Sequence, residues 1–381
     1  MSKNKKAIMW LSAGHFANDV YTGILNPIMP FIAAKIGITM AMATLVISVS
    51  SIFSSLLQPI FGFFADNMLK RVFIFWGLIL TSLFIPLAPL STGIGMLILF
   101  MILGSLGSSF YHPQSSGFIN KFASEETRAA DMGFFISMGS LGFSFGPLIA
   151  AFVTQYLGME KMPFISIMGV ILAFSMFLYV PKLSNIEKVP KYKSFKETFC
   201  TILACRKMNY LMVISMTKSL VTTSFCTLLP FLWKDMGYTP SYIGIALFLF
   251  VIAGGVGSFC SHKIEAKFGT KPLLYFSMTA TLPMIVIFAF TYQNHPLLSI
   301  IMFLIIGFTT MLAQPVTILM GQTILPQYKS VVAGFMNGFA WGIVAICLSL
   351  IGLTAQKYGI INVLVLLSMF PVFSTILVKR L

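Results

Sequence analysis

One acidic residue of this chain lies deep within a long apolar segment. Asp19 is near the middle of an apolar run that begins near Ala7, and His15 precedes it by one helical turn on the same face. A carboxyl group at the centre of a membrane-spanning helix costs on the order of 3 kcal/mol, so it is expected to face a cavity or a partner. Carboxylates and imidazoles both take up and release protons. This spacing predicts that Asp19 and His15 carry a proton.

A buried cation is expected at a similar depth. Residues 30–39 and 230–239 share Pro-Phe, Gly and Thr at an offset of 200, and under that offset Lys218 falls on Asn18, beside Asp19. Lys218 is therefore predicted to face the same central cavity and to contact the substrate. The other interpretation is that its long side chain extends to the cytoplasmic face of the membrane.

Further polar residues inside apolar segments complete the predicted site. His112, which precedes a proline, is expected to contact the proton or the substrate, or else to bond with backbone groups that the proline frees. The residues expected to bind substrate are Lys218, Asn26, Gln58, Tyr111, Gln114 and Gln314. For Gln58 and Gln114 the other interpretation is that each satisfies a neighbouring helix. No cofactor is predicted.

Two other interpretations of the charged residues stay open. Asp19, His15 and Lys218 could form a structural ion-pair network, or Asp19 and the two histidines could hold a metal ion. Ionisable groups inside a membrane usually mark a transport pathway, which favours proton coupling. A membrane enzyme that uses His15 as its base is disfavoured, because the sequence has no nucleophile motif or phosphate loop beside it.

Long apolar segments must position these residues. A bilayer core of about 30 Å needs about 20 helical residues, and twelve segments meet that requirement. They begin near Ala7, Met42, Val72, Gly93, Ala130, Met162, Met208, Ser241, Pro272, Leu297, Val331 and Ile360. A basic cytoplasmic connector over residues 181–207 separates six from six. We predict an all-α membrane protein with 12 transmembrane helices in two pseudo-symmetric six-helix halves, residues 1–180 and 208–381.

The composition excludes the main soluble classes. Apolar residues make up 57% of the chain and charged residues only 9%, against about 25% charged residues in a soluble domain. The net charge of +15 would suit nucleic acid only if the basic residues formed a stripe on one surface, and they lie instead at the ends of apolar runs. The expected environment is membrane lipid, with no nucleic-acid partner.

The basic residues also predict an orientation. Most of them gather on the side of the amino terminus, and only Lys35, Lys161, Lys234 and Lys357 fall on the opposite side. Cytoplasmic loops are enriched in Lys and Arg. Both termini are therefore predicted to be cytoplasmic, in a multi-pass protein of the inner (plasma) membrane.

The turn after the second predicted span carries a family signature. Residues 62–71 read GFFADNMLKR, which resembles the Gly-x-x-x-Asp-x-x-x-Lys/Arg-Arg motif of the major facilitator superfamily. The resemblance implies a cytoplasmic gate made by Gly62, Asp66, Lys70 and Arg71, with Arg128 as a partner. The copy in the second half has Ala266 where the acidic residue is expected.

A second motif lies in the fifth predicted span. Residues 142–151 read GFSFGPLIAA, which resembles the antiporter motif Gly-x-x-x-Gly-Pro-x-x-Gly-Gly of the same superfamily. Gly142, Gly146 and Pro147 match it, whereas Ala150 and Ala151 replace its last glycines. Small residues let helices approach closely. The resemblance implies exchange of two solutes rather than symport.

Three further segments resemble the fosmidomycin-resistance subgroup of that superfamily. They are GHFAND at residues 14–19, SSLLQP at residues 54–59 and GSSFYHPQSSG at residues 107–117. Gln114 and Gly117 depart from the subgroup, which has an acidic residue and an arginine there. The resemblance implies a monomeric, proton-coupled antiporter that exports a small polar or anionic compound, such as a fosmidomycin-like antimicrobial or a metabolite, by alternating access. The alternatives are an uptake symporter or facilitator of an organic solute, and a transporter of a metal ion or metal chelate.

Overall fold

The chain is helical throughout the part that the structure describes. This computed structural model describes residues 3–67, 71–181 and 195–381, and all regular elements within them are helices. The prediction of an all-α protein is confirmed. The chain divides into two compact units. Unit 1 is Met1–Lys191 with Trp233–Phe248, and unit 2 is Tyr192–Leu232 with Leu249–Leu381.

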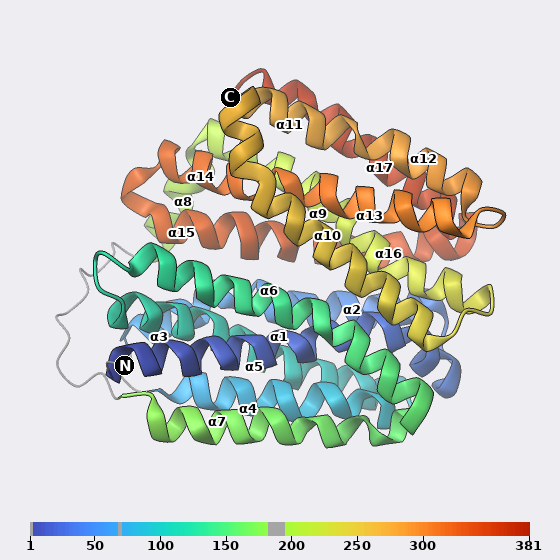
Figure 1. Ribbon diagram of the computed structural model, residues 1–381, viewed down its shortest axis with the longest axis horizontal. Coiled ribbons are helices and arrows are strands. Elements are labelled where there is room, and N and C mark those ends of the chain that lie inside the picture. The colour runs from blue at the N-terminus through green and yellow to red at the C-terminus, as the bar shows by residue number, and fades with distance from the viewer. Residues whose placement is uncertain (1–2, 68–70, 182–194) are drawn as a thin grey trace. The chain divides into compact units, whose positions relative to one another are not determined.

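Unit 1 contains the helices that carry the predicted proton site. Its helices are α1 (Lys3–Ile36), α2 (Met40–Ser55), α3 (Gln58–Asn67), α4 (Val72–Leu87), α5 (Ile94–Phe122), α6 (Arg128–Phe152) and α7 (Ser166–Tyr179). Short irregular helical turns cover Ala88–Leu90, Val153–Leu157 and Met159–Ile165. Helix α1 packs along α6 and also contacts α4, α5 and α7 (Figure 1). It is therefore the helix around which this bundle is built.

Unit 2 takes up most of the second half of the chain. Its elements are α8 (Phe195–Ala204), α9 (Arg206–Asp235), α10 (Pro240–Phe268), α11 (Thr270–Thr279), α12 (Thr281–Thr291), α13 (Pro296–Leu312), α14 (Gln314–Ile324), α15 (Lys329–Gly334), α16 (Ala340–Tyr358) and α17 (Ile360–Val378). The end of α9 and the start of α10 are grouped with unit 1. Residues 182–194, which belong to the predicted connector, lie outside the described residues.

Eleven segments of the described chain are long and apolar enough to cross a membrane. Each of them corresponds to one of the twelve predicted spans, and only the first predicted span has no counterpart among them. The first predicted span, now α1, has 34 residues but is not among the eleven. Its length is more than sufficient to cross a bilayer. Its polar residues, including His15, Asn18 and Asp19, lower its hydropathy.

Prolines divide three of these segments. Helices α2 and α3 are separated just before Gln58-Pro59, α13 and α14 just before Gln314-Pro315, and α11 and α12 at Ala280, three residues before Pro283. Proline lacks an N–H donor, and it disfavours helical geometry in the residue before it. In contrast, His112-Pro113 lies within the continuous helix α5. His112-Pro113 and Gln314-Pro315 therefore lie in different backbone structures, the first within a continuous helix and the second at a helix break.

The sequence repeat at an offset of 200 corresponds to a repeated local structure. Gly37 and Gly237 both have positive φ, +71° and +84°, which only glycine adopts without strain. The next amide closes the helix end in both copies, Ile38 N to Ala33 O at 3.0 Å and Tyr238 N to Trp233 O at 2.9 Å. The threonines that follow, at positions 39 and 239, then cap the first turn of the next helix.

Glycines bring α1 and α6 together. A Cβ atom at Gly142 would overlap the carbonyl oxygen of Phe16, and one at Gly146 would lie 2.5 Å from the carbonyl oxygen of Val20. On the facing side of α1, a Cβ atom at Gly23 would lie 2.6 Å from the carbonyl oxygen of Phe143. The glycines of the sequence motif thus let two backbones touch.

Candidate functional site

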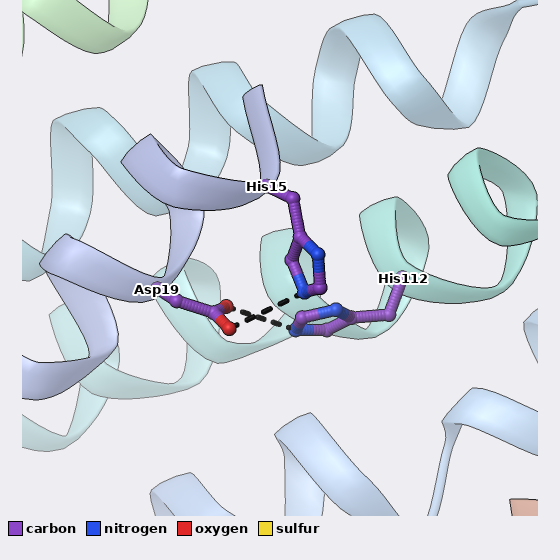
Figure 2. A group of neighbouring side chains, drawn as sticks. All are labelled: His15, Asp19 and His112. Atoms are coloured by element: carbon purple, nitrogen blue, oxygen red, sulfur yellow. Dashed lines mark ion pairs between the residues drawn. The ribbon is translucent and has the colours of Figure 1, made fainter. Parts of the chain in front are cut away.

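The predicted proton residues lie together in unit 1. Asp19 and His15 come from α1, and His112 reaches them from α5 (Figure 2). Asp19 Oδ2 is 3.3 Å from His15 Nε2, and Asp19 Oδ1 is 3.3 Å from His112 Nε2. The Asp19 side chain is 16% exposed and the His112 side chain 23% exposed. The cluster is therefore largely shielded but is not sealed.

A hydrogen bond on the far side of His15 determines where its proton lies. His15 Nδ1 is 2.8 Å from the carbonyl oxygen of Phe135 on α6. A carbonyl oxygen only accepts, so Nδ1 carries the hydrogen, and in the neutral ring Nε2 then presents a lone pair. Two lone pairs facing each other at 3.3 Å would repel. A proton between His15 Nε2 and Asp19 Oδ2, on either atom, removes that repulsion.

Asn18 gives His112 a second partner. The Asn18 amide nitrogen lies 3.0 Å from Asp19 Oδ1, 3.2 Å from His112 Nε2 and 3.3 Å from the Ser108 hydroxyl. An amide nitrogen only donates, whereas His112 Nε2 donates to Asp19 when protonated and accepts from Asn18 when not. The cluster therefore has a hydrogen-bonding partner for both protonation states of His112.

Gly139 forms the wall of the site on α6. A Cβ atom at this position would overlap the His15 ring and lie 2.8 Å from Asp19 Oδ2. One turn earlier on the same helix, the Phe135 ring stacks on the His15 ring with centroids 4.1 Å apart. Any side chain at residue 139 would displace the pair, so this glycine leaves the space in which His15 and Asp19 meet.

Three residues predicted to bind substrate make hydrogen bonds within unit 1. Tyr111 is fully buried and donates to the carbonyl oxygen of Leu11 at 2.6 Å. Gln114 Oε1 accepts from the backbone amide of Ile74, in the first turn of α4, at 2.8 Å. Gln58 donates to the carbonyl oxygen of Ser54 at 2.8 Å, across the break between α2 and α3. The bonds of Gln114 and Gln58 are of the kind that the alternative interpretation expects, and the role of all three residues in substrate binding stays a prediction.

The other predicted substrate residues lie on different helices. Asn26 is half-buried on α1, seven residues after Asp19 and thus on the same face. Gln314 is half-buried at the start of α14, beside the break that Pro315 introduces. Asn26 belongs to unit 1 and Gln314 to unit 2. Their role in binding stays a prediction.

Lys218 is a buried lysine on α9 of unit 2. Its residue is 2% exposed, and its ammonium group has no hydrogen-bond or ion-pair partner among the described residues. The hydroxyl groups of Ser219 and Thr227, on the same helix, are also buried without a partner among them. Burying a charge without a partner is costly. This stretch of α9 therefore keeps polar groups unsatisfied, and the predicted approach of Lys218 to Asp19 stays a prediction.

The predicted gate lies partly outside the described chain. Lys70 is not among the described residues, and the side chain of Asp66, near the end of α3, is not described either. Arg71 donates to the carbonyl oxygen of Val180, beyond the end of α7, and lies over the Phe177 ring at 5.3 Å.

The other gate residues lie on two helices. A Cβ atom at Gly62 would be 3.3 Å from Pro113 Cβ, so this glycine sits where α3 meets α5. Arg128 is exposed at the start of α6. Its pairing with Asp66 stays a prediction.

Three contributors to the site were not predicted from the sequence. The offset of 200 residues identifies Asn18 only as the position equivalent to Lys218, and Gly139 and the Phe135 carbonyl group are not among the predicted site residues. Gly139 stands three residues before Gly142, so the spacing of small residues along this segment was a usable signal. A backbone carbonyl group leaves no signal in the sequence.

Comparison with known families gives one match over nearly the whole chain. The model described as Major Facilitator Superfamily matches residues 11–377. The fosmidomycin resistance protein of Escherichia coli (strain K12) is 24% identical over 374 residues, covering 95% of this chain and 91% of that protein. The quinolone resistance protein NorA of Staphylococcus aureus (strain MSSA476) is 24% identical over 335 residues, covering 84% of this chain and 80% of that protein.

Solved transporter structures share the fold. A bacterial homolog to the human lysosomal transporter Spinster, in an inward-facing and unoccupied conformation, matches with a TM-score of 0.84 and 13% sequence identity. The match covers 100% of this chain and 97% of that one. Identity at this level supports the fold and nothing finer.

Proposed function

This chain belongs to the major facilitator superfamily, and we propose that it is a proton-coupled antiporter that exports a small polar or anionic compound by alternating access. As a member of that superfamily it is a multi-pass membrane transporter of small molecules and not an enzyme. We further propose that the coupling ion is the proton, that transport is outward and that the cargo is small and polar or anionic. The transporter is a monomer in the inner membrane, with both termini cytoplasmic.

The arrangement of His15 and Asp19 is the main support for proton coupling. The bond from His15 Nδ1 to the Phe135 carbonyl group turns a lone pair of the neutral ring toward Asp19 Oδ2, at 3.3 Å. A bound proton makes this arrangement favourable, and its loss makes it unfavourable. Release of the proton therefore supplies a local driving force for the side chains to separate. A change of this kind is what couples proton binding to a conformational change.

Asn18 keeps Asp19 and His112 hydrogen-bonded after the proton has left. When Asp19 holds no shared proton with His112, the amide of Asn18 still donates to both Asp19 Oδ1 and His112 Nε2. The 23% exposure of the His112 side chain gives the proton a path that does not pass through His15. We assign His112 to proton entry and exit, and the pair His15–Asp19 to proton retention.

The class of cargo follows from Lys218. The Lys218 nitrogen has no partner among the described residues and the residue is 2% exposed, so an ammonium group there would lack an anion to offset its burial. A bound anionic or strongly polar substrate would provide one. The resistance functions in the names of the two relatives, toward fosmidomycin and quinolones, support export as the direction.

The test is flux through the purified protein in proteoliposomes against a panel of small polar and anionic compounds. We expect an interior-acid pH gradient to drive accumulation of the substrate, since protons leave as the substrate enters, and a protonophore to abolish it. An interior-alkaline gradient should drive no accumulation. The opposite dependence on the gradient would identify an uptake symporter, and flux that ignores the gradient would refute proton coupling.

The variant Lys218→Met tests whether Lys218 serves substrate binding or the stability of the protein. Methionine has a similar length and no charge, so we expect unfolding to become harder by about 1–4 kcal/mol, as when buried ionic groups are replaced by apolar ones. Transport of the anionic substrate should nevertheless be lost. The measurements are the thermal unfolding midpoint in detergent and flux in proteoliposomes. Lys234→Met, at the end of the same helix, is the control and should change neither value. A Lys218→Met protein with full flux would remove Lys218 from the substrate site.

A further inference from the structure

The three side chains of the proton site also have the geometry of a metal site. One ligand atom from each of His15, Asp19 and His112 lies within 4.8 Å of the other two. Zinc binds histidine nitrogen and carboxylate oxygen at about 2.0–2.2 Å in a tetrahedron, which sets neighbouring ligand atoms about 3.4 Å apart. His15 Nε2 and His112 Nε2 are each 3.3 Å from a carboxylate oxygen of Asp19, the first from Oδ2 and the second from Oδ1. Each imidazole nitrogen is therefore at ligand spacing from the carboxylate, and rotation of the side chains would let all three residues bind one ion.

The surroundings of His15 are those of a metal ligand. Histidines that bind metals usually donate their other ring N–H to a carbonyl or carboxylate group, which fixes the ring and raises its basicity. His15 Nδ1 donates to the Phe135 carbonyl oxygen at 2.8 Å, and this bond leaves Nε2 directed at the centre of the cluster (Figure 2). A proton shared by Nε2 and Asp19 and a metal ion would use the same lone pairs of these two side chains.

Asn18 supplies an independent observation. The residue is fully buried, and its Oδ1 atom has no hydrogen-bond partner among the described residues. A half-turn of the amide puts this oxygen where the nitrogen now lies, 3.0 Å from Asp19 Oδ1 and 3.2 Å from His112 Nε2. An amide oxygen at those distances completes a set of four ligand atoms.

We propose that His15, Asp19 and His112 bind a divalent transition-metal ion of the zinc type, with Asn18 Oδ1 or water as the fourth ligand. The donor set of two imidazoles and one carboxylate is typical of zinc sites that keep a fourth position open. Magnesium and calcium are disfavoured because they prefer oxygen ligands. The metal and the coupling proton occupy the same atoms, so zinc blocks proton-driven transport. This last consequence rests on the proposed function, whereas metal binding does not.

Binding is measured on the full-length protein in detergent, by equilibrium dialysis with Zn²⁺ and by visible absorption with Co²⁺ as a spectroscopic substitute. We expect about one Zn²⁺ per chain at pH 7.5 and the absorption bands of tetrahedral Co²⁺. Binding should weaken toward pH 5, since the ligands must be deprotonated. His15→Gln and His112→Gln should each lower the affinity at least about 10–100-fold.

The chain provides matched controls, because it has four histidines and the other two, His262 and His295, are exposed. His262→Gln and His295→Gln should bind zinc as the unmodified protein does. Size-exclusion elution and helical circular dichroism establish that each variant is folded. Zinc binding that survives in both His15→Gln and His112→Gln, or that is lost in His262→Gln or His295→Gln, would overturn the proposal.

Magnesium in place of zinc is a further control and should neither bind to the protein nor inhibit transport.

Inhibition of flux by zinc distinguishes the metal-site proposal from the transport proposal. Zinc binding without inhibition of flux would uphold the metal site and contradict a role of the same atoms in coupling. Proton-driven flux that is indifferent to zinc, in a protein that binds none, would refute the metal site and leave the transport proposal intact.

Discussion

Asp19→Asn is expected to lower proton-driven flux at least about 100-fold, the scale of effect of a positioned proton-transferring group. Asparagine keeps the shape of the side chain but cannot take up a proton. The amide nitrogen can still donate to His15 Nε2, so the bundle stays folded. Exchange of labelled for unlabelled substrate across the membrane, without a pH gradient, should persist because it needs no net proton movement. Both rates are measured in the same proteoliposomes.

The control for this change is Asp235→Asn. Asp235 is exposed at the end of α9, so the variant alters the net charge by the same amount and should transport normally. Accumulation that is driven equally well by the pH gradient in Asp19→Asn and in the unmodified protein would remove Asp19 from the coupling step. Loss of both driven transport and exchange would instead assign Asp19 a structural role, because a coupling residue is not needed for exchange.

Gly139→Ala is expected to lower proton-driven flux about 10–100-fold in a protein that still folds. The new methyl group would overlap the His15 ring and come within 2.8 Å of Asp19 Oδ2, and both side chains can move away from it by rotation. Small misplacements of reacting groups cost about this much in rate. The measurement is driven flux, with the thermal unfolding midpoint as the check on folding. Zinc affinity should fall as well.

Gly133→Ala is the matched control on the same helix. A Cβ atom at Gly133 would contact nothing within 4 Å, so this variant should behave as the unmodified protein. Gly142→Ala differs from both, because the obstacle there is the backbone of Phe16, which cannot rotate away. We expect that variant to separate α1 from α6 and to unfold more easily. Normal flux in Gly139→Ala would show that the site tolerates a displaced His15.

The sequence was sufficient for the parts of this molecule that depend on local chemistry. Apolar segments predicted the spans, and the sequence repeat that includes Gly37 and Gly237 corresponds to two helix ends of the same geometry. The spacing of His15 and Asp19 placed them on one face of one helix, as the structure has them. Each of these inferences uses residues close together in the chain, where backbone geometry alone sets the relation.

The contacts between helices were harder to predict. His112 comes to within 3.3 Å of Asp19 from a helix that begins 75 residues later, at Ile94. Helical periodicity predicts which face of that helix His112 occupies, but not which helix lies against that face. Tyr111 and Gln114 resembled ligand-binding residues in the sequence, yet their polar atoms are bonded to the backbone of α1 and to that of α4. A polar side chain in an apolar segment signals that some partner exists, and only the packing decides which one.

The polarity of α1 also bears on how the protein enters the membrane during synthesis. Helix α1 precedes α5 and α6 in the chain, and it is not among the eleven described segments that are long and apolar enough to cross a membrane. His15, Asp19 and the amide nitrogen of Asn18 have partners on α5 and α6, which are made later. We therefore expect α1 to stay beside the insertion machinery until those helices arrive, so that the first bundle is released into the bilayer as a group.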